Sequence, residues 1–304
     1  MIVIDGTGFV SYDKPHCPCC LTKTIHGKTI FYHNVLEAKL ITPDGFALSV
    51  HTEFIEGDPK RDVKSDCELK AFYSMAKNIK RDFPQLPICL IGDSLYAQAG
   101  AFEIAKKNNW HFIFTFKKGS IPTIFEEFEK LRLRCPENSS KREDEELIQE
   151  YAWVNDLEHK GHKLSVLECK ELRKKTGVKK RFVWITDLRV NQWNYRKIAE
   201  GGRSRWKIEN QGFNTQKNGG YALEHSFSSN LDGAKNFYLL LQIAHIINQL
   251  LEKGSLLHHL MQATFGSIRN LARFLLEAFR TCLIGLDVLK AEIAKPYQIR
   301  IGFL

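Results

Sequence analysis

The sequence predicts an α/β protein in which a mixed β-sheet is flanked by helices. Two apolar runs, MIVI at residues 1–4 and LPICLIG at 86–92, are rich in Ile, Val and Leu and end in turn residues, as buried strands do. Between them, residues 29–56 alternate apolar and polar side chains, and residues 66–83 have apolar side chains at helical spacing. Strands and helices that alternate along one chain are typical of this fold class.

The first half of the chain gives its elements in a clear order. After the first strand, alternation on either side of Pro43-Asp44-Gly45 predicts a hairpin or meander. The helix over 66–83 ends at Pro84 and leads into the second buried strand. Residues 97–108 then predict a short helix, and residues 111–119 predict the next strand.

The second half predicts a division into further segments. Residues 120–148 are strongly charged and are expected to be helix or loop, and EYAWVND, KLSVLEC and RFVWITD follow as three strand-like runs. These runs are interpreted as a β-rich insertion, or alternatively as ordinary strands of the main sheet. We therefore expect a first part of the core at 1–119, the insertion at 120–190, a second part of the core at 191–250 and a C-terminal helical segment at 251–304.

Two apolar stripes after residue 230 predict helices that face the core. The first stripe comprises Phe237, Leu240, Leu241, Ala244, Ile247 and Leu251. The second comprises Ile268, Leu271, Leu275, Ala278 and Cys282.

Composition limits the class of protein without identifying a function. The 304 residues, 43% of them hydrophobic, suffice for a full core, and the net charge of +9 suits a polyanionic partner, although many cytosolic enzymes are equally basic. Neither a signal peptide nor a membrane-spanning helix is expected. The eight cysteines are unevenly spaced, which favours free thiols in a reducing cytoplasm over a disulfide framework.

Three carboxylates are candidate metal ligands. Asp5 and Asp93 follow the two buried strands, so both are expected at or near strand ends, and Glu209 is the acid of an otherwise basic helix. Arg205, four residues earlier, shares a helical face with Glu209. Taken singly, each Asp is better explained as a turn or cap residue, and Arg205–Glu209 as a surface pair. Together these groups could hold a metal and grip phosphates.

These three acids also carry a resemblance to a known family. Asp5 in IDGT, Asp93 in IGDSLYA and Glu209 in RSRWKIEN resemble the Asp-Asp-Glu (DDE) triad of bacterial insertion-sequence transposases, whose catalytic core is ribonuclease H-like. The resemblance covers about residues 1–250, includes HCPCC and SDCELKAF, and is most specific from GRSRWKIEN to NGGYALEH. It implies that the three acids are catalytic and bind Mg²⁺ or Mn²⁺.

The chain departs from this family at two positions. Many relatives have a Tyr three residues before the Arg and a Lys seven residues after the Glu. Here Gly202 and Gln216 occupy those positions, and Lys217 comes one residue late. The departures bear on the roles of the Tyr and the Lys but leave the triad intact.

The resemblance implies metal-dependent cleavage and strand transfer at the ends of an insertion sequence. The expected partners are transposon-end and target DNA and further copies of the chain, in the cytoplasm at the nucleoid, with no membrane. Relatives usually carry an upstream region that binds terminal repeats, and since Asp5 lies near residue 1 we expect that region to be missing. A hydrolytic nuclease of the same fold and an inactive DNA-binding relic are the alternatives.

Four basic residues are candidates for DNA-phosphate binding. Arg205 and Lys217 lie on the side of the helix that carries Glu209, whereas Arg203 and Lys207 are equally well explained as a solvated basic face. Trp206 is expected to pack in the core.

One short cysteine motif could bind zinc. Cys17 and Cys20 form a CxxC pair, but no second CxxC follows. His26, His33 and Cys67 could complete a zinc site only if folding brought them close. Reduced thiols in a turn are the default interpretation, and a structural zinc is the alternative.

Overall fold

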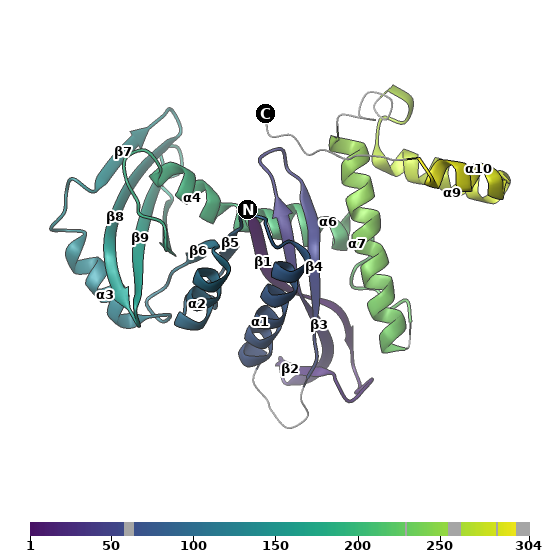
Figure 1. Cartoon of the computed structure of the whole chain (residues 1–304), viewed down its shortest axis with the longest axis horizontal. Coiled ribbons are helices and arrows are strands. Elements are labelled where there is room, and N and C mark those ends of the chain that lie inside the picture. Colours follow the sequence, from purple (N-terminus) through teal and green to yellow (C-terminus); the bar gives the residue numbers. More distant parts are fainter. Residues whose placement is uncertain (58–63, 229, 255–262, 284, 296–304) are drawn as a thin grey trace. The chain divides into compact units, whose positions relative to one another are not determined.

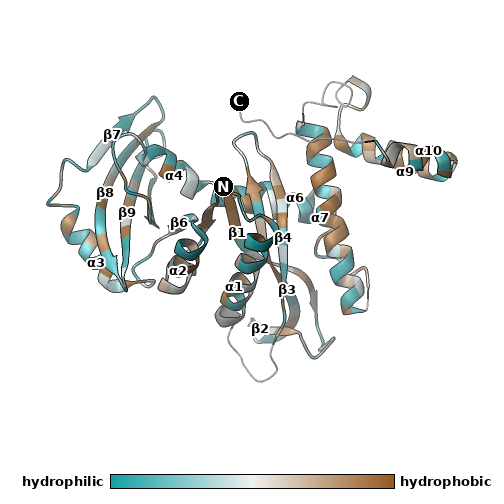
Figure 2. Cartoon of the chain, in the orientation of Figure 1, coloured by the Kyte–Doolittle hydropathy of each residue, from teal (hydrophilic) through white to brown (hydrophobic). Residues whose placement is uncertain are grey.

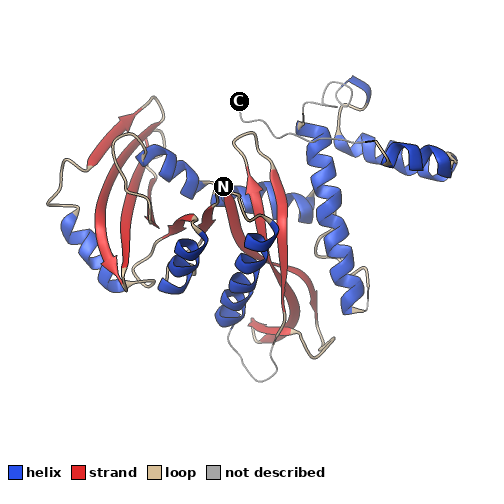
Figure 3. Ribbon diagram, viewed as in Figure 1, coloured by secondary structure: helices blue, strands red, loops and turns tan. Residues whose placement is uncertain are grey.

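The computed structural model describes residues 1–57, 64–228, 230–254, 263–283 and 285–295 (Figure 1). The chain divides into two compact units, Met1–Ile246 and Ile247–Leu304. The described strands all belong to the first unit, and the described part of the second is helical (Figure 3). No helix among the described residues is long and apolar enough to cross a lipid bilayer.

One mixed sheet organises the first unit. Its strand order is β2-β3-β1-β5-β6-β10-β9-β8-β7, and β4 also pairs with β3. The predicted α/β class, with a mixed sheet flanked by helices, is therefore confirmed. The antiparallel part consists of β1 (Ile2–Tyr12), β2 (Leu21–Ile25), β3 (Lys28–Ile41) and β4 (Ala47–Ile55). β3 and β4 form the predicted hairpin around Gly45, whose φ of 88° requires a residue that tolerates the left-handed region.

Two parallel strands extend this sheet on the other side of β1. They are β5 (Cys89–Gly92) and β6 (His111–Thr115), each preceded by a helix: α1 (Lys64–Asp82) and α2 (Ala99–Asn108). In Figure 1 both helices lie in front of the sheet, and they contact β3, β4 and β6. The predicted apolar face of α1 is buried through Phe72, Met75, Ala76 and Ile79. Each large side chain buried in this way contributes about 1.5–3 kcal/mol.

The three strand-like runs of the second half continue the same sheet. After α3 (Pro122–Leu131) come β7 (Ser139–Glu143), β8 (Leu147–His159), β9 (His162–Arg173) and β10 (Lys179–Thr186). These strands are antiparallel to one another, and β10 pairs with β6 through Trp184 and Thr115. They are therefore hydrogen-bonded into the main sheet, as the alternative interpretation expected, although they also follow one another as a block.

A broken helical run packs on the opposite face of the sheet. It consists of α4 (Tyr195–Arg203), α5 (Arg205–Lys207), the π-helix η1 (Ile208–Phe213) and α6 (Asn214–Asn218). α4 contacts β5, β6 and β9, and η1 contacts β1 and β4. Since side chains alternate along a strand, Val3 faces this side whereas Ile2 and Ile4 face α1. The sheet thus has an apolar core on each face.

The helix α7 (Leu231–Lys253) buries a face that the apolar pattern did not predict. Leu241 is buried as expected, but Leu240 and Ala244 are exposed. Gln242 and His245 are buried instead, because buried hydrogen-bonding partners satisfy their polar atoms. In Figure 2 hydrophobic residues, coloured brown, nevertheless occur along much of this helix.

The second unit contains α9 (Ile268–Thr281) and α10 (Leu286–Ile293). Ser267 caps α9 by accepting a hydrogen bond from the backbone N–H of Asn270, which satisfies one of the free donors of the first turn. The second apolar stripe was expected to face a core throughout, but Leu275 and Cys282 are exposed. An apolar stripe at helical spacing therefore did not identify the buried face here.

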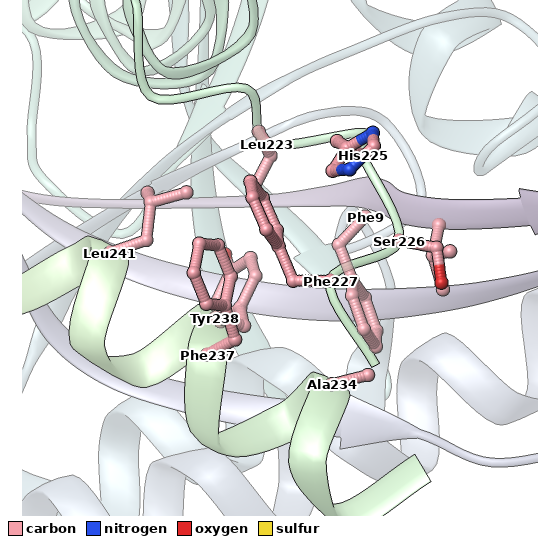
Figure 4. Close-up of a pocket in the computed structure, with 10 residues that line it drawn as sticks. Phe9, Leu223, His225, Ser226, Phe227, Ala234, Phe237, Tyr238 and Leu241 are labelled. Carbon is pink, nitrogen blue, oxygen red and sulfur yellow. The ribbon is translucent and has the colours of Figure 1, made fainter. Parts of the chain in front are cut away.

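A small apolar gap lies between β1, residues 223–227 and the first part of α7. Figure 4 shows Phe9, Leu223 and Tyr238 turned toward one another around it. Its volume is about 10 Å³, which is at the lower limit for one water molecule. It is therefore a packing gap of the core and not a binding pocket.

Candidate active site

Asp5 and Asp93 come together from adjacent parallel strands. Val3 pairs with Ile91, and the same register carried two residues further brings Asp5 opposite Asp93. Asp93 follows β5 directly, as predicted, and its Oδ1 accepts a hydrogen bond from the backbone N–H of Leu95 at 2.8 Å. The prediction that Asp5 ends a strand is wrong, because β1 continues to Tyr12 through its pairing with β3.

The environment of Asp5 disfavours its charged form. Burial is the main cause that raises the pKa of this carboxyl from 3.8 to about 6. The neighbouring positive charge of Arg205 opposes the rise, the negative charges of Asp93 and Glu68 add to it, and the backbone N–H of Gly6 lowers the pKa slightly. Perturbed carboxyls with a charged partner are typical of functional sites.

Glu68 is an acid of this site that the sequence did not identify. It lies on α1 and accepts a hydrogen bond from the hydroxyl of Tyr96 at 3.0 Å. A Cβ placed on Gly6, next to Asp5, would lie 3.4 Å from the Glu68 carboxylate. Burial and then the charge of Glu68 raise the pKa of Tyr96 well above its ordinary value, so Tyr96 stays a neutral donor. The spacing of α1 gives no indication of this role, although SDCELKAF belongs to the family resemblance.

Arg205 contacts Asp5, 200 residues away in sequence. Its Nη1 lies 3.4 Å from Asp5 Oδ2, and each side chain is 22% exposed. The guanidinium is also 6.0 Å from the ring centre of Trp206. The sequence linked Arg205 to Glu209, whereas the structure pairs it with the first acid of the triad.

Glu209 lies in a π-helical turn and is exposed. The sequence predicted one regular helix here, but residues 208–213 form η1 between two short α-helical segments. π-helical turns are rare and often occur at functional sites. η1 packs against β1, which carries Asp5.

Arg203 and Lys207, two of the predicted phosphate-binding residues, make protein contacts. Arg203 forms an ion pair with Glu171 on β9. Lys207 donates to the backbone carbonyls of Thr42 at 3.2 Å and Pro43 at 3.3 Å. These contacts fasten the helical run to the sheet, and DNA binding by either residue stays a prediction.

Lys217 and Gln216 lie on α6, beyond the π-turn. Lys217 pairs with Glu224 at 2.7 Å. Gln216, at the position of the family's Lys, is fully buried; its Nε2 lies 2.7 Å from Gln242 Oε1 and 2.9 Å from His245 Nδ1. A lysine at position 216 would place a second ammonium beside Gln242, whose Oε1 already accepts a hydrogen bond from the buried Lys39 at 2.7 Å, so the cluster disfavours lysine here.

Gly202 is explained by the close approach of Trp184. A Cβ at position 202 would lie 2.3 Å from Nε1 of the Trp184 ring. A tyrosine, which many transposases of the resembled family carry at this position, could not enter unless the tryptophan moved. The departure from the family pattern therefore reflects packing between α4 and β10.

A groove of about 450 Å³ extends from Asp93. Its basic lining residues are Lys117, Lys118, Arg181, Arg203 and Arg205. Its aromatic lining residues are Phe116, Phe125, Phe182, Trp184 and Trp206. Trp206 is 54% exposed, so its expected core position is wrong. Cations beside an acid can bind phosphates, and aromatic faces can stack on bases. The sequence pattern did not reveal that β6 and β10 contribute to this surface.

The acids have the donor chemistry that Mg²⁺ or Mn²⁺ requires, namely hard carboxylate oxygens. However, Asp5, Asp93 and Glu209 do not form a group of described residues whose ligand atoms all lie within 4.8 Å of one another. Like charges repel, and Arg205 already lies at Asp5 Oδ2. The residues fit a divalent cation by chemistry, and Glu209 would have to approach the two aspartates to share it.

No protein-family model matches this chain, and no curated protein matches it either.

Proposed function

We propose that this chain is the catalytic core of a DDE transposase with a ribonuclease H-like fold. The element order supports the fold: four antiparallel strands, of which β1, β3 and β4 are long and β2 is short, are followed by a helix, a parallel strand, a second helix and a second parallel strand. The proposed substrate is DNA at the ends of an insertion sequence, together with target DNA. The proposed assembly is a homo-oligomer on paired ends.

One observation carries this proposal: Asp5 and Asp93 meet on neighbouring parallel strands, with Arg205 against Asp5 and the basic, aromatic groove beginning at Asp93. Burial raises the pKa of Asp5 to about 6, so the charged form of this carboxyl destabilises the fold. A bound cation would offset that cost, and perturbed carboxyls of this kind are typical of functional sites. A purely DNA-binding surface would be expected to carry cations alone.

Asp5, Asp93 and Glu209 are the residues that would hold Mg²⁺ or Mn²⁺, which would supply charge stabilisation and an activated nucleophile. Water attacks the phosphorus at the element end, and the P–O3′ bond breaks to leave a 3′-hydroxyl and a 5′-phosphate. That 3′-hydroxyl then attacks a target phosphorus, and the target releases its own 3′-hydroxyl. The protein's part is to position the strands and neutralise phosphates, through Arg205 and the groove cations.

A second candidate, an inactive DNA-binding relic, is favoured by a different observation. Glu209 is exposed, and among the described residues its carboxylate does not form a group with those of the two aspartates in which all ligand atoms lie within 4.8 Å of one another. In a relic the groove would still bind DNA, while the acids would no longer assemble. The two candidates differ in the effect of divalent metal on DNA cleavage.

The test is a cleavage and strand-transfer assay on labelled terminal-repeat DNA, with and without Mg²⁺. Asp5→Ala, Asp93→Ala and Glu209→Ala should each abolish metal-dependent cleavage. Glu200→Ala is the matched control, because Glu200 is an exposed acid on α4 that pairs with Arg196 and should be dispensable. Full activity in any of the three variants would remove that acid from the mechanism. DNA binding without cleavage by the parent chain would support the relic.

A further inference from the structure

A second group of potential metal ligands lies apart from the acids. The turn between β1 and β2 carries Cys17 and Cys20, and β3 carries His33. The two Sγ atoms are 3.6 Å apart, and His33 Nε2 lies 3.4 Å from Cys17 Sγ and 3.5 Å from Cys20 Sγ. Across the described residues, this is the only group of three or more His, Cys, Asp or Glu side chains with ligand atoms all within 4.8 Å.

These separations match the edges of a zinc tetrahedron. With Zn–S of about 2.3 Å and Zn–N of about 2.1 Å, tetrahedral geometry places two sulfurs about 3.8 Å apart and sulfur about 3.6 Å from nitrogen. A Cys17–Cys20 disulfide would instead need an S–S distance of about 2.05 Å. The three atoms therefore lie around a space of the right size for one ion.

Backbone contacts hold the cysteine turn in this position. Cys20 N–H donates to the Cys17 carbonyl at 3.3 Å, and Gly57 N–H, after β4, donates to the Cys19 carbonyl at 2.9 Å. A Cβ on Gly57 would lie only 2.8 Å from the Cys20 carbonyl oxygen, so the turn sits close against this glycine. The turn geometry is thus fixed by groups other than the thiols.

His33 is suited to act as the nitrogen ligand. Its side chain is buried, and its Nε2 faces both thiols. Neutral imidazole is a common zinc ligand. His16 stacks on Tyr12 with ring centres 4.2 Å apart, and the Tyr12 ring in turn meets His33 edge-on.

We propose that Cys17, Cys20 and His33 bind one zinc ion, which fastens the β1–β2 turn to β3. Solvent or His16 completes the tetrahedron. The site is structural, because it joins two strands of the sheet and uses none of the residues assigned to DNA chemistry. It stands whether or not the chain is a transposase.

The primary experiment uses the full-length chain. The purified protein should contain one zinc per chain, and Co²⁺ added to the metal-free protein should give thiolate-to-cobalt charge-transfer absorption with tetrahedral d–d bands. Zinc should then displace the Co²⁺ and abolish these bands. A chain without zinc that gives no such absorption with reduced thiols, or a disulfide between Cys17 and Cys20 in freshly purified protein, would overturn the proposal.

Variants identify the ligands. Cys17→Ser and Cys20→Ser should each lower metal content at least tenfold, whereas Cys19→Ser, the matched control in the same turn, should keep one zinc per chain. His33→Cys should still bind Co²⁺ with stronger charge-transfer absorption, which keeps the test informative if His33→Ala fails to fold. Loss of the d–d bands in His16→Ala would assign the fourth ligand to His16, and their retention would assign it to solvent. Zinc loss in Cys19→Ser, or its retention in Cys17→Ser, would contradict the ligand set.

Discussion

Replacing Asp5 by Asn should stabilise the protein at alkaline pH. Above pH 6 the Asp5 carboxylate is charged in both the folded and the unfolded chain, but the folded chain holds it in a buried site next to other acids. The pKa difference between 3.8 and about 6, at about 1.4 kcal/mol per pKa unit, corresponds to about 3 kcal/mol of destabilisation by the charged form. Asn keeps the shape without the charge, so it should recover up to about 3 kcal/mol.

The gain should depend on pH in a defined direction. Because the folded-state pKa is raised, the folded parent chain takes up a proton as pH falls from about 6 toward 3.8, while the unfolded chain remains ionised. The parent therefore recovers the lost stability over this window. The difference between Asp5→Asn and the parent should be largest at pH 8 and should nearly disappear near pH 4.

Urea unfolding of both proteins at several pH values measures this difference. Asp144→Asn is the matched control: backbone N–H groups of Glu146 and Leu147 lower the pKa of Asp144, so the same substitution there should not stabilise. Millimolar Mg²⁺ should raise the unfolding free energy of the parent but not that of Asp5→Asn. An Asp5→Asn protein no more stable than the parent at pH 8, or equally stabilised at pH 4, would refute the assigned environment of Asp5.

Three further results are expected. Lys39→Ala should destabilise the fold by about 3–5 kcal/mol in thermal or urea unfolding, because it leaves the carboxylate partner of this fully buried lysine uncompensated; a loss below about 1 kcal/mol would contradict the ion pair. Gly202→Tyr should destabilise the chain through its clash with Trp184, and a Trp184→Gly change in the same chain should restore part of the loss, as a double-mutant cycle would show. Arg205→Ala and Lys217→Ala should each flatten the log–log salt dependence of DNA affinity by about one unit, and a salt-independent affinity would argue against phosphate contact altogether.

The order of elements was predictable because it depends on local patterns. Alternation predicted β3 and β4, helical spacing predicted the buried face of α1, and a short apolar run predicted β5 and the position of Asp93 after it. The extent of β1 was not predictable, since polar and glycine residues after Asp5 break the apolar run, and pairing with β3 alone maintains the strand.

The parts of the candidate site that the sequence missed depend on long-range contacts. Glu68 meets Asp5 only because α1 crosses the sheet, and Arg205 meets Asp5 across 200 residues. His33 joins Cys17 and Cys20 through the pairing of β2 with β3, which brings its position next to the turn. The buried face of α7 was also missed. A hydropathy pattern predicts that Gln242 and His245 are exposed unless their buried hydrogen-bonding partners are known.

The π-helical turn changes how residues are counted along the segment that carries Glu209. A π-turn contains one residue more than an α-turn, so every side chain beyond it is set back by one position relative to a regular helix. Lys217 follows Glu209 by eight residues, but because Glu209 lies within η1 and the rest of this turn precedes Lys217, the angular position of Lys217 corresponds to a residue seven places along an uninterrupted α-helix. The segment thus presents the basic side chain of Lys217 in that direction, and Gln216 takes the buried direction instead.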